Sequence, residues 1–268
     1  MGSKNRFSIG LSVIGIFIGI FFYIFRQNYA NAQKDFGSQL DSDLNDQSEN
    51  TLDFGIVSNI SGIVNQSKKK YKATFDLKSD GSFQRYLNDS NPFSDPTYKP
   101  LDLSPIISNF TYNKSSKFSL RSSAGIAFAD MAWAFRDHFN KSNKLYIVSA
   151  YRSYGFQNSL LKNGCEKKRC AEPGSSEHQA GLAVDISVAS KNGKTIQMTT
   201  GSDYYNRMDQ NAYKYGFHNT YKKGVEIDGK MAEHRHRRFV GIPFATYLHD
   251  NDLTIAEYFI MHAVEYKI

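Results

Sequence analysis

Two short blocks of the sequence hold residue types that bind metal ions and transfer protons. In residues 173–186, Pro-Gly-Ser-Ser-Glu-His-Gln-Ala-Gly-Leu-Ala-Val-Asp-Ile, His178 and Asp185 lie seven positions apart. In the second block, Glu233 and His236 are spaced Glu-x-x-His. Two imidazoles and a carboxylate are the kind of ligands that hold a catalytic zinc ion, with the fourth position left for water. We therefore predict a zinc site formed by His178, Asp185 and His236.

A β-strand is expected to position Asp185. From residue 182 to residue 188, larger apolar side chains alternate with small or polar ones, which is the period of a strand with one buried face. This pattern puts Asp185 on the polar face, with His178 in the turn that leads into the strand. Gly181, between them, permits a close approach of the chain.

Glu233 and Arg152 are candidates for the catalytic chemistry. A carboxylate beside a metal-bound water can accept its proton and pass it to a leaving amine, so Glu233 is the candidate general base. Residues 233 and 236 of a regular strand would face opposite sides, so the chain must bend between them. Residues 144–149 predict a strand that delivers Arg152 at its end, where the guanidinium could hold a terminal carboxylate or a developing oxyanion.

Two polar residues near these groups are candidates for substrate binding. Gln157 either hydrogen-bonds substrate or caps a turn, and Ser176 contacts either substrate or His178. Upstream of the histidine block, Cys165 and Cys170 enclose four residues. Two nearby cysteines in an exported chain more often form a disulfide than a metal site. We expect this disulfide to constrain a loop at the rim of the active-site cleft.

Three ordered blocks together resemble a known family. They are Ser-x-Tyr-Arg-Ser at residues 149–153, Ser-x-x-His-x-x-Gly-x-Ala-x-Asp at residues 175–185, and Glu-x-x-His-x-Arg-aromatic-Val-Gly at residues 233–241. These blocks are similar to those of the VanY-type D-alanyl-D-alanine carboxypeptidases, zinc peptidases that trim bacterial cell-wall peptides. The resemblance covers residues 85–266. It implies an α+β fold, in which a small antiparallel sheet is flanked by helices, as in D-Ala-D-Ala peptidases and hedgehog-like proteins.

Two segments depart from the family pattern. The gap of the Glu-x-x-His block, usually Pro-Trp, holds His234-Arg235 here, and the Arg-Tyr-Pro that follows Gly-Phe is Thr220-Tyr221-Lys222. His234 is therefore a rival metal ligand. The residues after His236 keep the family register, however, which favours His236.

The resemblance implies a function and a partner. The function is a Zn²⁺-dependent D,D-carboxypeptidase that removes the terminal D-Ala from a peptidoglycan stem peptide. The alternatives are an L,D-carboxypeptidase or a cell-wall endopeptidase of the same fold, or a non-catalytic wall-binding module. Glu233 together with all three ligands favours an enzyme, since a degenerate site tends to lose one of these residues.

The N-terminal residues predict attachment to a membrane. Residues 7–25 are an apolar run that would be about 28 Å long as a helix, close to the thickness of a bilayer's hydrocarbon core. Lys4 and Arg6 precede it and favour a cytoplasmic position for residues 1–6. We therefore expect a single-pass transmembrane anchor, with the catalytic domain outside the cytoplasm.

A cleaved signal peptide is the alternative to this anchor. Residues 30–32, Ala-Asn-Ala, fit a cleavage site, and cleavage would make the protein secreted. In both cases the rest of the chain is exported. Residues 26–84, rich in Asn, Asp, Ser, Gln and Lys, are expected to form a juxtamembrane spacer, and residues 85–268 the zinc peptidase domain.

Composition and periodicity complete the expectation. The 268 residues carry a formal charge of +7, which suits an anionic envelope or membrane surface. No nucleic-acid motif accompanies the scattered Lys and Arg, so we expect no nucleic-acid partner, and we expect a monomer. Apolar spacing predicts helices over residues 120–139 and 203–216, and residues 237–241 predict a short strand. Thr254 and Glu257 are spaced as a helix-starting capping box.

Overall fold

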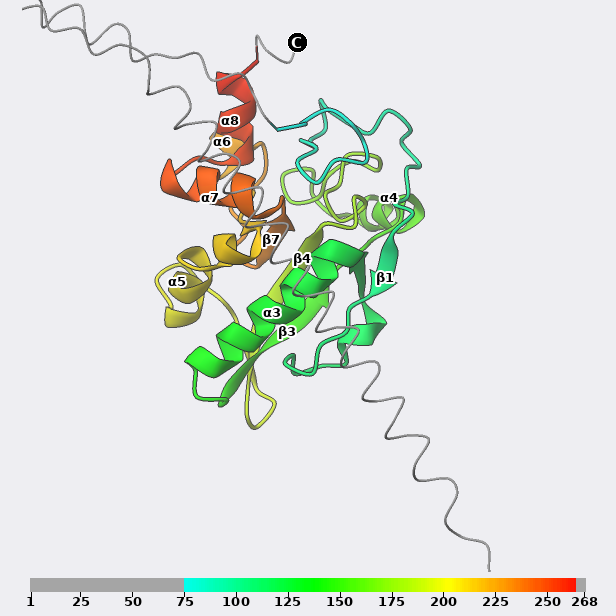
Figure 1. Cartoon of the computed structure of the whole chain (residues 1–268). Helices are drawn as coiled ribbons and strands as arrows, with labels where there is room; N and C mark the ends of the chain where they lie inside the picture. The colour runs from blue at the N-terminus through cyan, green and yellow to red at the C-terminus, as the bar shows by residue number, and fades with distance from the viewer. Residues whose placement is uncertain (1–74, 264–268) are drawn as a thin grey trace, which may run out of the picture. The chain divides into compact units, whose positions relative to one another are not determined.

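An antiparallel sheet is the frame of residues 75–263, the part of the chain that the structure, a computed structural model, describes. Its five strands are β3 (Asn143–Ser149), β4 (Ala183–Ser190), β5 (Thr195–Ile196), β6 (Phe217–His218) and β7 (His236–Phe239). The order is β3-β4-β7-β6, with β5 also paired to β4. Strand β4 therefore has β3 and β7 as its neighbours, although these strands are far from each other in the sequence (Figure 1).

One long helix packs against this sheet. Helix α3 (Ser122–His138) lies across β3 and β4 (Figure 1), close to the range that the periodicity predicted. Its apolar face forms one core with the two strands; the core includes Phe128, Met131, Phe135, Leu145, Ile147, Val184 and Ile186. Burial of side chains of this size contributes about 1.5–3 kcal/mol each, so this core anchors the strands that carry the site. Beside it, β1 (Leu103–Pro105) and β2 (Ser119–Arg121) form a separate two-stranded sheet.

A second core lies between the last two helices and the first described residues. Helices α7 (Ile242–Asp250) and α8 (Ile255–Met261) contribute Phe244 and Tyr258, and the ring of Phe75 stacks on Phe244 at 4.4 Å. Leu77 is fully buried in the same core. Residues 75–84, which we expected in the spacer, therefore pack as part of the domain. Their apolar side chains stand singly among polar ones, so composition did not distinguish them.

The start of α8 follows the predicted capping box. The Thr254 hydroxyl accepts from the Glu257 backbone N–H at 3.3 Å, and the Glu257 carboxylate accepts from the Thr254 N–H at 2.7 Å. The predicted helix over residues 203–216 is instead divided into α5 (Asp203–Asp209) and the 3₁₀ helix η2 (Ala212–Tyr215). Between them, Asn211 donates its side-chain amide to the carbonyl of Arg207 at 3.0 Å, satisfying a helix-end carbonyl.

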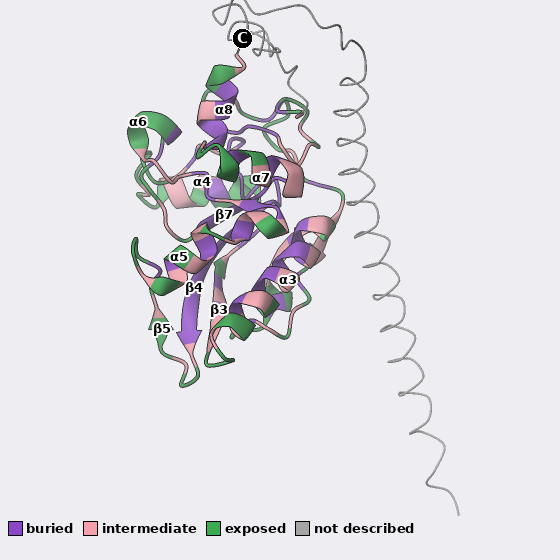
Figure 2. Ribbon diagram, turned by 60° about the vertical axis from the view of Figure 1, so that its left-hand side comes forward, coloured by how far each residue is buried: buried purple, intermediate pink, exposed green. Residues whose placement is uncertain are grey.

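Strand β4 is buried on both faces, so the expectation of one exposed face was wrong. All its residues except the last are buried (Figure 2). Side chains do alternate between the two faces of β4 as predicted, but the face with the polar side chains is also buried. There the hydroxyl of Ser187 donates to the carbonyl of Ile196 at 2.7 Å, and Asp185 lies among other charged side chains.

The short elements complete the α+β fold, which agrees with the expected class. They are the helices α4 (Tyr154–Lys162) and α6 (Val225–Asp228) and the 3₁₀ helix η1 (Ser115–Lys117). Within residues 75–263, no helix has the length and apolarity needed to cross a bilayer. The expected membrane segment at residues 7–25 lies outside the described residues.

Candidate metal centre and active site

Three buried side chains converge between β4, β7 and the turn before β4. Nε2 of His178 lies 3.3 Å from Oδ1 of Asp185, and Nδ1 of His236 lies 3.2 Å from the same oxygen. These potential ligand atoms all lie within 4.8 Å of one another. The structure thus brings together the three residues that the motifs predicted as metal ligands.

Strand register explains this convergence. Asp185 is paired with His236 on β7 and with Ser149 on β3, and directly opposed residues of antiparallel strands present their side chains on one face. His178 reaches the same face from a turn that ends at Gly181. That glycine has φ +66°, and a Cβ there would lie 2.7 Å from the side chain of Leu103, so the close approach requires glycine.

The outward nitrogen of each histidine is already engaged. Nδ1 of His178 donates to the carbonyl of Ala150 at 2.7 Å, which leaves Nε2 free as a ligand. Nε2 of His236 donates to Oε2 of Glu177 at 2.7 Å, which leaves Nδ1 free. Such outer hydrogen bonds fix ring orientation and tautomer in metal sites. With two imidazoles, one carboxylate and this support, the residues fit a zinc ion.

Burial and neighbouring charges shift the pKa values of the three converging residues. Burial lowers the pKa of His178. Burial opposes ionisation of Asp185, but the two histidines that face it hold its pKa well below the usual value. Burial also opposes protonation of His236, yet hydrogen bonds to Asp185 and Glu177 raise its pKa to about 9. Two carboxylates therefore flank His236, with Asp185 at Nδ1 and Glu177 at Nε2, and each carboxylate also faces an arginine.

Glu177 is a component of the site that sequence reasoning missed. Its side chain is fully buried, accepts from the Thr220 hydroxyl at 2.9 Å, and lies 3.4 Å from Nη1 of Arg238. Burial would raise the pKa of Glu177, but Arg238 and His236 lower it to about 2. Its position directly before His178 was the available signal. No sequence pattern indicated that Arg238, about sixty positions away, would be its partner.

We expect Glu177→Ala to lower the free energy of unfolding by about 3–5 kcal/mol, because it leaves the Arg238 charge buried without its partner. Chemical denaturation of the purified variant measures this loss. Glu166→Ala is the matched control, since the Glu166 side chain is 72% exposed and its ion pair with Arg169, at 3.8 Å, lies on the surface. Equal stability of Glu177→Ala and wild type would exclude a structural role for the buried ion pair.

Arg152 reaches the site from the end of β3. Its Nη2 lies 2.6 Å from Oδ2 of Asp185, and its Nε donates to the Ser149 hydroxyl at 2.9 Å. The guanidinium therefore holds the oxygen of Asp185 that faces away from the two histidines. Its side chain is still 17% exposed, and it lines a cavity.

That cavity has a volume of about 620 Å³ and borders the candidate metal centre at Asp185. Asp185, Arg152 and Glu233 line it together with residues of three loops and of α4; among these are Phe156, Leu160, Cys165, Cys170, Met198, Thr199, Met231 and His234. The predicted bend lies at the turn His234-Arg235. The Glu233 carboxylate contacts Arg235 at 3.4 Å, and the Glu233 N–H donates to the carbonyl of Tyr221.

The remaining predicted residues have supporting positions. Gln157 is 1% exposed and donates to the carbonyl of Ala171 at 2.8 Å, so it lies beneath the loop and does not line the cavity. Ser176 is also buried, and its hydroxyl accepts from the His178 N–H at 3.3 Å, which favours its alternative role of supporting the histidine. Cys165 and Cys170 are disulfide-bonded, and both line the cavity as expected for a rim loop.

Comparison with known proteins agrees with this architecture. The family model described as VanY, D-alanyl-D-alanine carboxypeptidase, matches residues 117–242. The Bacillus subtilis protein YodJ, a putative carboxypeptidase by its description, is 38% identical over 172 residues, which are 60% of this chain and 62% of YodJ. The chain thus spans less than two thirds of that relative.

Two solved structures are also similar. The LdcB LD-carboxypeptidase has 30% sequence identity and a TM-score of 0.58, over 67% of this chain and 86% of that one. The D,D-pentapeptidase VanY from a VanB-type resistance cassette, solved as a point mutant in complex with Zn(II), has 25% identity and a TM-score of 0.50, over 66% and 98%. With its motifs, fold and site, the chain belongs to the VanY-type D-alanyl-D-alanine carboxypeptidase family.

Proposed function

We propose that this protein is a zinc-dependent D,D-carboxypeptidase that removes the terminal D-Ala from peptidoglycan stem peptides. The observation that carries the proposal is the convergence of His178, Asp185 and His236, of which Asp185 lines a cavity together with Arg152 and Glu233. Family membership, and the Zn(II) bound to the VanY relative, support the same function.

His178, Asp185 and His236 would hold the zinc ion through Nε2, Oδ1 and Nδ1. When bound, zinc lowers the pKa of a coordinated water and polarises a carbonyl. The outer hydrogen bonds to Ala150 and Glu177 keep both imidazoles in the tautomers that this requires.

Glu233 and Arg152 would perform the remaining steps. The Glu233 carboxylate accepts a proton from the attacking water and transfers it to the nitrogen of the leaving D-Ala. Arg152 donates hydrogen bonds to the terminal carboxylate of the peptide or to the oxyanion that develops on the scissile carbonyl. Its contact with Asp185 holds the guanidinium at the edge of the metal site.

A second candidate is L,D-carboxypeptidase activity on the tetrapeptide. The similarity to the LdcB LD-carboxypeptidase favours it, since the match covers 86% of that structure. Both activities need the same ligands, base and anion binder. The two activities differ in the configuration of the residue before the scissile bond, so a comparison of the two substrates distinguishes them.

Incubation of the purified protein with stem pentapeptide and tetrapeptide, followed by mass analysis, tests the proposal. A D,D-carboxypeptidase shortens the pentapeptide by one alanine and leaves the tetrapeptide unchanged. Cleavage of the tetrapeptide alone would identify the L,D activity. Binding of either peptide without cleavage, in zinc-loaded protein, would identify a wall-binding module and overturn the enzyme assignment.

We also propose that residues 7–25 anchor the protein in the cell membrane, with the catalytic domain on the outer side. The apolar run and the preceding basic residues support this arrangement. Protease added to intact cells should then degrade the domain, and the protein should fractionate with membranes. Recovery of a shortened chain from the medium would instead indicate a cleaved signal peptide.

Arg152→Lys tests the anion-binding role. We expect most of the activity to be lost with zinc content unchanged, because a lysine ammonium cannot reproduce the planar two-point contact of a guanidinium. Steady-state kinetics on the cleaved peptide and metal analysis measure the two quantities. Turnover near that of wild type would mean that Arg152 serves only to hold Asp185.

A further inference from the structure

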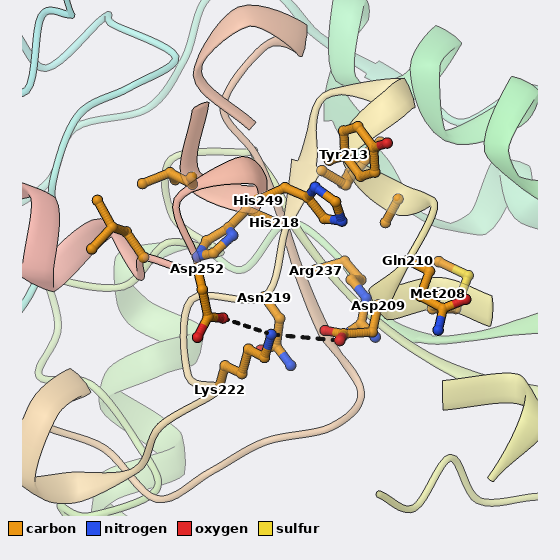
Figure 3. Close-up of a pocket in the computed structure, with 14 residues that line it drawn as sticks. Met208, Asp209, Gln210, Tyr213, His218, Asn219, Lys222, Arg237, His249 and Asp252 are labelled. Carbon is orange, nitrogen blue, oxygen red and sulfur yellow. Dashed lines mark hydrogen bonds and ion pairs between the residues drawn. The ribbon is translucent and has the colours of Figure 1, made fainter. Parts of the chain in front are cut away.

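A second cavity lies on the other side of β7 from the metal ligands. Its volume is about 170 Å³, and it shares no lining residue with the larger cavity described above. Its walls come from α5, η2, β6, β7, α7 and the loops between them (Figure 3); the polar lining residues include Asp209, His218, Asn219, Lys222, Arg237, His249 and Asp252. Because side chains alternate along a strand, Arg237 points away from the site of its neighbour His236.

Arg237 is a buried cation without an ionic partner among the described residues. It is 1% exposed, and its Nη1 donates to the carbonyls of His234 and His236 at 3.0 and 2.7 Å. Its Nη2 has no hydrogen-bond partner in the described part of the chain. Its charge is partly offset by the ring of Tyr205, 5.8 Å from the guanidinium carbon, and by attraction to the Asp209 carboxylate, although burial outweighs both and lowers the pKa of Arg237. Arginine is always charged, and buried charges are normally paired, so this arrangement is incomplete.

Asn219 presents a second unsatisfied group at the same cavity. It is 6% exposed, and within residues 75–263 neither its amide nitrogen nor its amide oxygen has a hydrogen-bond partner. The Tyr205 hydroxyl approaches it without the geometry of a hydrogen bond. Buried amides are nearly always hydrogen-bonded, so an unmatched donor here, beside an unmatched guanidinium nitrogen, points to a ligand that accepts hydrogen bonds.

The other charged groups of the cavity are already engaged. Lys222 lies between Asp209 and Asp252, with its ammonium 3.5 and 3.4 Å from their carboxylates (Figure 3). Burial lowers the pKa of His218 to about 3, so its ring is neutral. Among the fully buried polar atoms of the described wall residues, those without a hydrogen-bond partner belong to Arg237, Asn219 and the neutral His218.

We propose that this cavity, the Arg237 pocket, binds a small oxyanion, a carboxylate or a phosphate, through Nη2 of Arg237 and the side-chain amide of Asn219. The volume admits several waters and thus a ligand of a few non-hydrogen atoms. Guanidinium groups hold such oxyanions through charge-assisted hydrogen bonds. The pocket is distinct from the catalytic cavity. The bound oxyanion contacts a side chain that also hydrogen-bonds the backbone of His236.

Thermal unfolding of the purified full-length protein tests the proposal. Sodium acetate and sodium phosphate are titrated separately, each against sodium chloride at equal ionic strength. A ligand that binds only the folded protein raises Tm with concentration, by roughly 5 °C or more at a hundredfold excess over its Kd. The acetate and phosphate arms identify the source of the oxyanion. Equilibrium dialysis with the radiolabelled anion that raises Tm should find one bound per chain.

Variants assign the effect to the pocket. The rise in Tm should disappear in Arg237→Leu and in Asn219→Ala. If Arg237→Leu does not fold, Asn219→Ala alone provides the test. It should persist in Arg207→Leu, the matched control on α5, since Arg207 does not line this pocket. It should also persist in His178→Ala, which excludes binding at a metal. No rise with either anion, or an equal rise in both pocket variants, would overturn the proposal.

Discussion

Glu233→Gln should reduce hydrolysis of a D-Ala-terminated peptide by about 10²–10⁴-fold, the usual effect of losing a general base. Glutamine keeps the size and much of the hydrogen bonding of the side chain but cannot accept the proton. Because Glu233 lines the cavity and is not among the three converging ligand residues, the variant should fold, retain zinc and still bind peptide. Steady-state kinetics, metal analysis and peptide-binding calorimetry measure these three properties.

Glu226→Gln is the matched control for this experiment. Glu226 is exposed on the short helix α6 and does not line the cavity. The activity of the Glu226→Gln variant should therefore equal that of the wild-type protein. If Glu233→Gln cleaved as fast as wild type, another carboxylate would have to act as the base. If the wild-type protein itself bound peptide without cleaving it, the chain would be a binding module.

His178→Ala and His236→Ala should each abolish stoichiometric zinc binding and, with it, peptide hydrolysis. Loss of a single outer hydrogen bond to a metal ligand lowers metal affinity by about 10–100-fold, and loss of a ligand itself should exceed this. Metal analysis of the purified variants, with circular dichroism to verify folding, provides the measurement. His138→Ala, on the exposed end of α3, should retain one zinc per chain. Full zinc in both ligand variants would disprove the assignment.

The main features of the candidate metal site were predictable because they are local or tied to short motifs. The alternation around Asp185 indicates a strand, and the Glu-x-x-His spacing requires a bend before His236. The structure has that strand and that turn, and pairs the two residues directly. The fold class followed from the resemblance carried by the same motifs. None of these inferences needed knowledge of which distant side chains meet.

The parts that sequence reasoning missed depend on tertiary contacts. In the sequence Glu177 resembles an ordinary surface charge and Arg238 is a motif residue without an assigned role. Only the fold brings them together as a buried ion pair. Of the two roles considered for Gln157, a hydrogen bond to substrate or to a turn, its burial against the carbonyl of Ala171 favours the second. The covered second face of β4 has the same origin, since a period of two reports which way side chains point and not what lies over them.

The end of β3 sets how this domain tolerates changes in chain length. Between Ser149 and Arg152, Ser149 pairs with Asp185, the carbonyl of Ala150 accepts from His178, and the Arg152 guanidinium binds Asp185. One inserted residue would redirect every following side chain, so tags or inserted domains should not be placed in this segment. By contrast, Lys191 and Asn192 are exposed in the turn after β4, which makes that turn a suitable point for inserting a reporter or opening a circular permutant.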